Sequence, residues 1–232
     1  MKLLVIRGNA ADPHEITVTR DQATAPDLTT RMADATTGYI RMVAFTPESG
    51  ARLRQATEAL TKTGATRFVI DLRGASRGDL DDGLAAARPF LTGGVLAVKV
   101  DKTRKEPVSA GAAGGAITAR SVLLVNQGTA GAGELFAAAL DGNDRADLIG
   151  ERTRGRAARQ RLTRLPDGSA LLLTWQRYLS PKNVDIHEKG LTPDIEVATP
   201  EIEFGAEPPA TDRVLERALQ YFTEKVPTRN AA

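Results

Sequence analysis

The chain has no cysteine, few aromatic residues and no long hydrophobic run. The absence of cysteine from its 232 residues excludes disulfides and thiolate metal sites, and it leaves the redox state of the compartment undetermined. Because aromatic residues make up only 4%, the core is expected to consist of Leu, Val, Ile and Ala. The opening apolar run, Leu3 to Ile6, is too short for a secretory signal, and no run approaches a membrane span. We therefore expect a chain with neither an export signal nor a membrane span.

A strong charge of either sign is also missing. The formal net charge is +2, which is too small to indicate binding to nucleic acid. The arginines are interspersed with acidic residues rather than gathered in a stripe, and few aromatic side chains are available to stack on bases. No nucleic-acid partner is expected.

Residues for metal binding or histidine-based catalysis are sparse. The two histidines, His14 and His187, lie far apart and predict neither a metal site nor a Ser-His-Asp triad. Four aspartates between Asp71 and Asp82 leave a cation site open as an alternative. The preferred interpretation is that they favour the positive end of a helix dipole. No metal and no cofactor is expected.

Strand-like and helix-like patterns alternate along most of the chain. Strands are expected at 38–45, 67–73, 95–100, 121–125 and 147–149. Helices are expected from Thr46 to Gly64, at 80–91, at 134–140 and at 212–221. A hairpin is expected at 161–175, around a Pro-Asp-Gly-Ser turn, and a hairpin-like pair at 3–6 and 15–20. This order predicts an α/β fold with a mostly parallel sheet, flanking helices and a C-terminal hairpin.

One turn is more informative than the rest. Thr129 to Glu134 read Thr-Ala-Gly-Ala-Gly-Glu, between an apolar strand at 122–125 and a helix-like run at 135–140. A sharp strand-to-helix turn of small residues is where a serine hydrolase presents its hydroxyl. The residue expected at the apex is Gly131, which has no side chain to react. The segment therefore has the form of a nucleophile turn without a nucleophile.

Five motifs occur in the order found in the carboxyl-terminal processing, or tail-specific, serine peptidases. They are Gly38-Tyr39-Ile40-Arg41, Val69-Ile70-Asp71-Leu72-Arg73, the segment Val125 to Glu134, the segment Gly150 to Arg156, and a group from Asp167 to Val197. Together they make nearly the whole chain resemble this family. The resemblance implies a layered core similar to the ClpP/crotonase fold, and a serine-lysine dyad that cuts peptides near protein C-termini.

The same resemblance assigns roles to positions. It places the nucleophile at Gly131, the base at Arg156 and the glutamine that orients the base at Gln160. The oxyanion region falls on Arg77 and Gly78, where Arg77 replaces a glycine of the family. A guanidinium stays protonated and cannot act as a general base, and glycine cannot attack a carbonyl. Thr129 is the nearest hydroxyl and the candidate substitute nucleophile.

The N-terminal region resembles the end of a PDZ domain, which precedes the core in this family. The resemblance implies end strands of a truncated PDZ-like module at 1–21, a linker at 22–36 and the peptidase-like core at 37–232. A free-standing hairpin unrelated to PDZ is the alternative for 1–21. Family members usually work outside the cytoplasm, so a periplasmic or extracytoplasmic location is implied.

Three functions remain open from the sequence. The first is a degenerate, inactive peptidase homologue, a pseudoprotease that binds peptides or unfolded protein segments by strand addition. The second is a scaffold or homo-oligomer subunit that acts through its surface. The third is an active serine-type peptidase with a rearranged nucleophile, Thr129, or else Ser121 or Ser76 brought in by folding.

Overall fold

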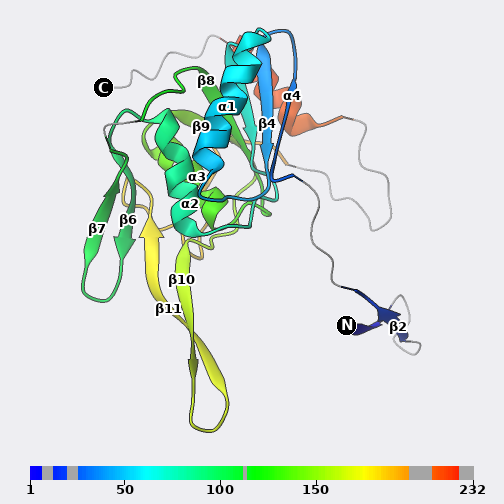
Figure 1. Ribbon diagram of the computed structural model, residues 1–232, viewed down its shortest axis with the longest axis vertical. Helices are drawn as coiled ribbons and strands as arrows, with labels where there is room; N and C mark the ends of the chain where they lie inside the picture. Colours follow the sequence, from blue (N-terminus) through cyan, green and yellow to red (C-terminus); the bar gives the residue numbers. More distant parts are fainter. Residues whose placement is uncertain (7–12, 20–25, 112–113, 199–210, 225–232) are drawn as a thin grey trace.

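A six-stranded sheet forms the centre of the computed structural model, which describes residues 1–6, 13–19, 26–111, 114–198 and 211–224 (Figure 1). The strand order is β12-β9-β8-β5-β4-β3. The strands are β3 (Leu28–Met32), β4 (Thr37–Met42), β5 (Arg67–Asp71), β8 (Arg120–Val125), β9 (Ala146–Gly150) and β12 (Ile195–Glu196). Neighbouring strands from β4 to β12 are parallel, and only β3 pairs antiparallel. A mixed α/β fold with a mostly parallel central sheet is thereby confirmed.

Helices cover both faces of this sheet. They are α1 (Ser49–Lys62), α2 (Leu80–Ala87), the short η1 (Arg88–Phe90), α3 (Ala132–Gly142) and α4 (Arg213–Thr223). On β5, Phe68 and Ile70 belong to the core with α1, α2 and α3, whereas Val69 lies in a smaller core with α4. Successive side chains of a strand point to opposite faces, so a continuous apolar run is what a sheet buried on both sides requires. None of the helices among the described residues is long and apolar enough to cross a membrane.

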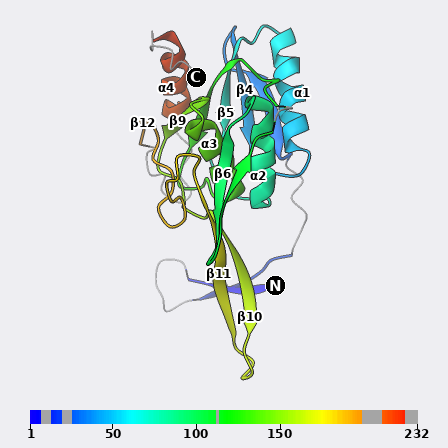
Figure 2. The same cartoon turned by 90° about the vertical axis from the view of Figure 1, so that its left-hand side faces the viewer.

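A second, four-stranded sheet is entirely antiparallel. Its strands, in spatial order, are β10 (Ala158–Arg164), β11 (Ala170–Leu179), β6 (Val95–Val100) and β7 (Lys105–Ser109). Only Arg177, Tyr178 and Leu179 of β11 pair with β6. The rest of the β10–β11 hairpin extends beyond the body of the protein (Figures 1 and 2). The hairpin expected from the sequence is present, but it is longer than expected and belongs to this sheet.

The structure corrects the expected linker at 22–36. Leu28–Met32 form β3, an edge strand whose five residues pair with β4 from Met42 to Gly38. Leu28 and Met32 pack against the main core, which explains why this segment is a strand although three polar residues separate them. The strand β7 was likewise not expected from the sequence.

The N-terminal pair of strands is present. β1 (Lys2–Val5) and β2 (His14–Thr17) pair antiparallel, with Lys2 opposite Thr17. They form a two-stranded sheet separate from the other two. The connection between these two strands, 7–12, and the N-terminal part of the expected linker, 22–25, lie outside the described residues.

Candidate active site

Gly131 lies at the apex of a sharp turn between β8 and α3. It is the N-cap residue of α3 and has φ 58° and ψ −115°, a backbone conformation that residues with side chains rarely adopt. A Cβ built there would lie 3.5 Å from Leu80 Cδ2, an ordinary contact, so the turn has room for a small side chain. β8 ends at the carboxyl edge of the parallel strands, the edge where α/β proteins place their sites.

Glu134 connects this turn to the segment that precedes β10. Its carboxylate is fully buried. Oε2 accepts hydrogen bonds from the N–H groups of Gly131 at 3.0 Å and Arg156 at 2.7 Å. Oε1 accepts from Thr153 Oγ1 at 2.5 Å and from the N–H of Gly155 at 2.6 Å. The structure therefore brings Gly131 and Arg156 to one oxygen atom.

The side chains of Arg156 and Gln160 differ in their hydrogen bonds. Arg156 is exposed, and its guanidinium forms no hydrogen bond with the part of the chain that the structure describes. Gln160 lies on β10, where its Nε2 donates to Thr174 Oγ1 at 3.3 Å across the hairpin. The glutamine thus bonds within the hairpin and not to Arg156.

The loop expected to contribute an oxyanion hole contacts the Gly131 turn. The N–H of Ala130 donates to the carbonyl of Ala75 at 3.0 Å. Within that loop, Arg77 directs its guanidinium to Asp27 at 3.1 Å, while its carbonyl accepts from the N–H of Phe45. Gly78 has φ 116°, and a Cβ there would lie 2.2 Å from the carbonyl oxygen of Phe45, so only glycine fits.

The hydroxyl of Thr129 is engaged in hydrogen bonds inside the protein. Its side chain is fully buried. Oγ1 donates to the carbonyl of Leu72 at 2.8 Å and accepts from the N–H of Asn126 at 3.1 Å. Of the other candidate hydroxyls, Ser121 is buried and donates to the carbonyl of Ala119, whereas Ser76 is exposed in the oxyanion loop.

A cluster of charged residues lies beside the turn, and sequence reasoning found only its aspartates. Arg159 of β10 donates to both carboxylate oxygens of Asp79, at 2.7 and 3.1 Å, and to Asp81 at 3.0 Å. Asp81 also accepts from Tyr178 Oη and pairs with Lys99, each at 3.0 Å. These hydrogen bonds from Arg159 hold the pKa of Asp79 below its usual value. Burial, with Asp81 nearby, raises the pKa of Tyr178 to about 12.

This cluster links α2 to the base of the hairpin. Asp79 caps α2 by accepting from the N–H of Asp81, as expected for acids at a helix start. The residue between them is Leu80, whose Cδ2 would lie 3.5 Å from a Cβ built at Gly131. The local sequence contains only Asp79 and Asp81, because their partner Arg159 is distant in sequence.

The remaining candidate ligands do not assemble into a metal site. The buried Asp71 accepts from Tyr39 and from Arg41 and Arg73, so it is already surrounded by donors. Among the described residues, no three His, Cys, Asp or Glu side chains are placed to hold a metal ion. His187 Nδ1 is buried and has no hydrogen-bond partner in that part of the chain, whereas His14 lies on β2.

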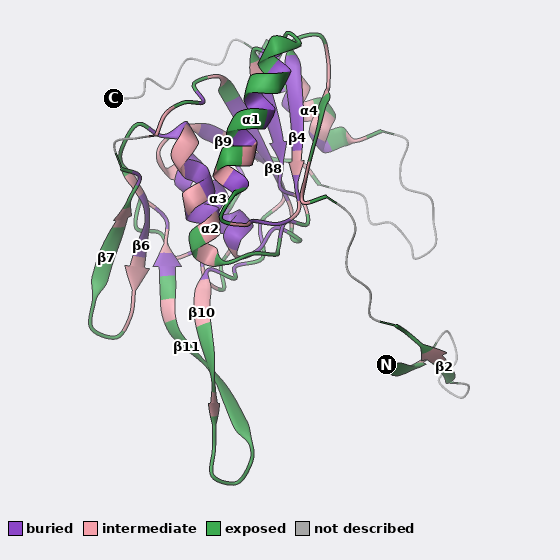
Figure 3. Cartoon of the chain, in the orientation of Figure 1, coloured by how far each residue is buried: buried purple, intermediate pink, exposed green. Residues whose placement is uncertain are grey.

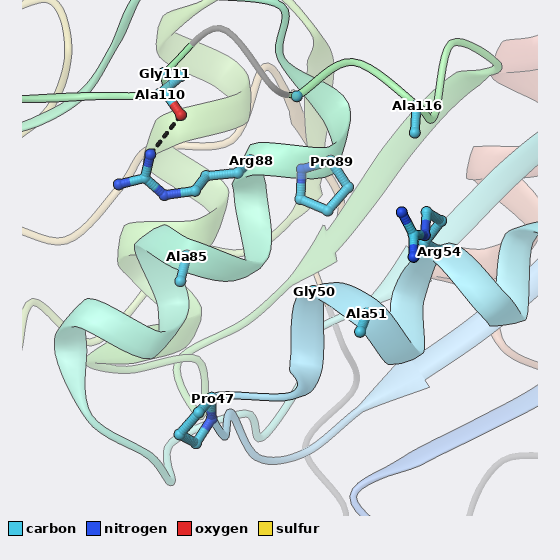
Figure 4. A pocket seen from close by; sticks show the side chains of 11 residues that line it. Pro47, Gly50, Ala51, Arg54, Ala85, Arg88, Pro89, Ala110, Gly111 and Ala116 are labelled. Carbon is cyan, nitrogen blue, oxygen red and sulfur yellow. Dashed lines mark hydrogen bonds between the residues drawn. The ribbon is translucent and has the colours of Figure 1, made fainter.

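A cavity of about 440 Å³ lies elsewhere, between the start of α1 and the end of α2 (Figure 4). Gly50 and Arg54 of α1 and Pro89 of η1 are among its lining residues. Arg88 also lines it and donates to the carbonyl of Ala110 (Figure 4). None of Gly131, Glu134 and Arg156 is among the lining residues, so this cavity is distinct from the turn.

Comparison with known proteins identifies the family. Residues 36–197 match Peptidase family S41. A carboxyl-terminal-processing protease from Synechocystis sp. is 33% identical over 228 residues, which cover 96% of this chain and 53% of the relative. The carboxy-terminal processing protease CtpA of Bacillus subtilis is 30% identical over 188 residues, covering 81% of this chain and 40% of the relative.

A solved structure agrees with the sequence relatives. The photosystem II D1 C-terminal processing protease superimposes with a TM-score of 0.67 at 30% identity, over 80% of this chain and 52% of that one. The chain spans about half the length of the relatives it matches. With the match covering most of its residues, the chain belongs to peptidase family S41, the family of the C-terminal processing serine proteases.

Proposed function

We propose that this chain is a catalytically inactive member of its family that binds extended segments of peptides or unfolded proteins. The observation that carries the proposal is the pair of backbone hydrogen bonds from Gly131 and Arg156 to Glu134 Oε2. The resemblance assigns the nucleophile and the base to these two positions. The proximity of the two positions supports that assignment. Glycine cannot act as the nucleophile and arginine cannot act as the base, so the family's reaction is not expected here.

Each substitution removes one step of the family's reaction. The nucleophile must form a bond to the scissile carbonyl carbon, and Gly131 presents only hydrogen at the position where a hydroxyl would stand. The base must accept the proton of that hydroxyl. Arg156 carries a guanidinium, which has five N–H donors and no acceptor, so it can donate hydrogen bonds but cannot take a proton.

The alternative, catalysis by Thr129, has less support. A nucleophilic hydroxyl must reach a substrate carbonyl, and Thr129 Oγ1 is buried, with its proton directed to Leu72 and its oxygen accepting from Asn126. Attack would require both bonds to break. Their loss would also remove the bond that ties Thr129 to Leu72, which follows β5.

The remaining parts of the proposal rest on the resemblance. We place residues 1–21 as end strands of a PDZ-like module, a placement that the antiparallel pairing of β1 with β2 supports. The core, similar in its layers to the ClpP/crotonase fold, would then include β3. A location outside the cytoplasm and assembly into homo-oligomers belong to the same proposal.

Two measurements on the same protein test inactivity and binding. A fluorophosphonate probe should label neither the wild-type chain nor Thr129→Ala, and a fluorescein-labelled, reduced and alkylated lactalbumin should raise its anisotropy on binding without being cut. The double variant Gly131→Ser, Arg156→Lys serves as the positive comparison, because it returns both side chains to the family's types. Labelling of the wild-type chain at any residue would refute inactivity. If Thr129→Ala alone abolished cleavage of the lactalbumin, the alternative would stand instead.

A further inference from the structure

The β10–β11 hairpin exposes an unusual amount of apolar surface. Leu162 is 62% exposed, Leu172 60%, Leu171 47%, Trp175 44% and Leu173 42%. Beyond its base the hairpin lies outside the body, and most of its length is exposed (Figure 3). Scattered surface leucines need no explanation, but a contiguous group on one projecting element marks an interaction site.

Apolar side chains occupy both faces of this hairpin. Leu162 is opposite Leu172, and Arg161 is opposite Leu173. Because cross-strand partners share a face, Leu162 and Leu172 lie on one face while Leu171 and Leu173 lie on the other. A two-stranded ribbon is marginal by itself and gains stability when a third strand extends it. The hairpin therefore has the features of an incomplete sheet.

One edge of that sheet is β10, and the other is β7. In the order β10-β11-β6-β7, β10 pairs on one side only, so the other side presents unpaired backbone groups. The strand begins at Ala158, two residues after Arg156, whose N–H is bonded to Glu134. The start of β10 is thus close in sequence to the segment that Glu134 ties to the Gly131 turn.

The edge carries uncompensated positive charge. Arg161 and Arg164 are both exposed, and neither forms an ion pair within the described parts of the chain. By contrast, Arg159 is paired with Asp79, and Arg177 with Asp185 at 3.2 Å. Arginines on an edge strand also discourage unwanted pairing. That role alone would not call for leucines on both faces.

We propose that an acidic, extended segment of a partner protein adds to β10 as an antiparallel third strand. Opposite charges directly across a strand pair stabilise it, and so do facing apolar side chains. The positions opposite Arg161 and Arg164 should therefore be acidic, and the position opposite Leu162 apolar. Read along an antiparallel partner, this gives the pattern acid, any residue, apolar residue, acid. The inference rests on the proposed peptide-binding function and names its surface and its preferred sequence.

Charge complementarity also decides against a second copy as the occupant. Two β10 strands paired edge to edge would bring the arginines of both copies together along one pair of strands. Like charges across strands are destabilising. A partner strand with acids three residues apart meets both guanidiniums without such a conflict.

A charge exchange between protein and peptide tests the proposal. The probe is a fluorescein-labelled ten-residue peptide with Glu-Thr-Leu-Glu at its centre, compared with a Lys-Thr-Leu-Lys peptide of the same length, by anisotropy at low salt. The wild-type chain should prefer the glutamate peptide. Arg161→Glu, Arg164→Glu should weaken that peptide about tenfold or more and reverse the preference, since each pair changes from attraction to repulsion. The matched control is Arg104→Glu, Lys105→Glu at the start of β7, the opposite edge of the same sheet, which should leave the preference unchanged.

The outcomes separate this inference from the proposed function. Equal affinity for both peptides, or a preference that the Arg161, Arg164 variant leaves unreversed, would overturn the docking surface. If labelled lactalbumin still bound in that case, the peptide-binding function would stand without this surface. Sedimentation of the wild-type chain as a dimer that Leu172→Glu dissociates would also overturn the proposal, because the hairpin would then be covered by a second copy.

Discussion

The Glu134 region and the β10–β11 hairpin use their side chains in opposite ways. Around Glu134, a buried carboxylate accepts four hydrogen bonds and holds the Gly131 turn to the segment from Thr153 to Arg156, which precedes β10. On the hairpin, apolar side chains are exposed on both faces, and Arg161 and Arg164 form no ion pair with any residue that the structure describes. The hydrogen bonds of the first region are made within the described residues, whereas we propose that a partner segment completes the second. The hydrogen bonds to Glu134 are therefore expected to stabilise the fold, whatever the chemistry of the site.

Glu134→Gln should have the largest effect on stability. The amide keeps one acceptor oxygen but turns an NH₂ group toward donors, and a buried hydrogen-bond network that includes a charged acceptor is lost. We expect the free energy of unfolding to fall by about 3–5 kcal/mol in urea denaturation. Glu58→Gln is the control, since Glu58 is exposed and pairs only loosely with Arg54 at 3.9 Å. A loss below about 1 kcal/mol would mean that the Glu134 region is not the anchor that its geometry indicates.

Gly131→Ala should have the next largest effect. The left-handed backbone conformation at Gly131 disfavours any Cβ, although Leu80 leaves space for it at 3.5 Å. The free energy of unfolding is expected to fall by about 1–3 kcal/mol, measured by urea denaturation. Gly168→Ala is the comparison that measures the cost of the backbone conformation alone. Gly168 has φ 87° in the hairpin turn, and a Cβ built there has nothing within 4 Å. If Gly131→Ala were neutral while Gly168→Ala was costly, the turn would have relaxed, and the strained apex would not be part of the rigid framework.

Asp79→Asn should have a smaller effect that depends on pH. Asparagine caps a helix about as well as aspartate, so the variant isolates the pair with Arg159. The pKa of Asp79 is lowered in the folded protein, so the unfolded chain takes up a proton at a higher pH than the folded one. The contribution of the pair is therefore fully present above the pKa of an aspartate in the unfolded chain, and it is lost as the pH falls through the lower pKa of the folded protein.

The measurement is thermal unfolding of both proteins from pH 6 to pH 2. Because the Asp79 carboxylate is half exposed, the difference at pH 6 should stay within about 1 kcal/mol, and the two curves should converge in acid. If the two proteins were equally stable at pH 6 and in acid, Asp79 would stabilise α2 through its cap alone.

The contrast between the two regions also explains what the sequence could predict. The strand, turn and helix around Gly131 follow from a contiguous run of residues, and the parallel sheet follows from the alternation of strands and helices. The bonds from Glu134 to Thr153 and Gly155 join distant segments, and only the order of the motifs suggested that those segments meet.

Three features could not be predicted, for different physical reasons. The edge strand β3 is short and mostly polar, so its pairing with β4 rather than its composition makes it a strand. The pair of Arg159 with Asp79 depends on the hairpin register, which shifts between Arg159 and Gln160. The exposure of Leu162 and Leu172 depends on the hairpin extending away from the body, which no local pattern encodes.

Leu172→Thr should have the smallest effect, and it tests the hairpin side of the contrast most directly. Threonine keeps a strand-forming side chain, and Leu172 is already 60% exposed, so little apolar burial is lost. The free energy of unfolding should change by less than about 0.5 kcal/mol, as for other exposed positions. Leu123→Thr on β8 is the matched change at a fully buried leucine and should cost several times more. A loss above about 2 kcal/mol at Leu172 would mean that the hairpin is buried in the isolated protein, and the two regions would then be alike.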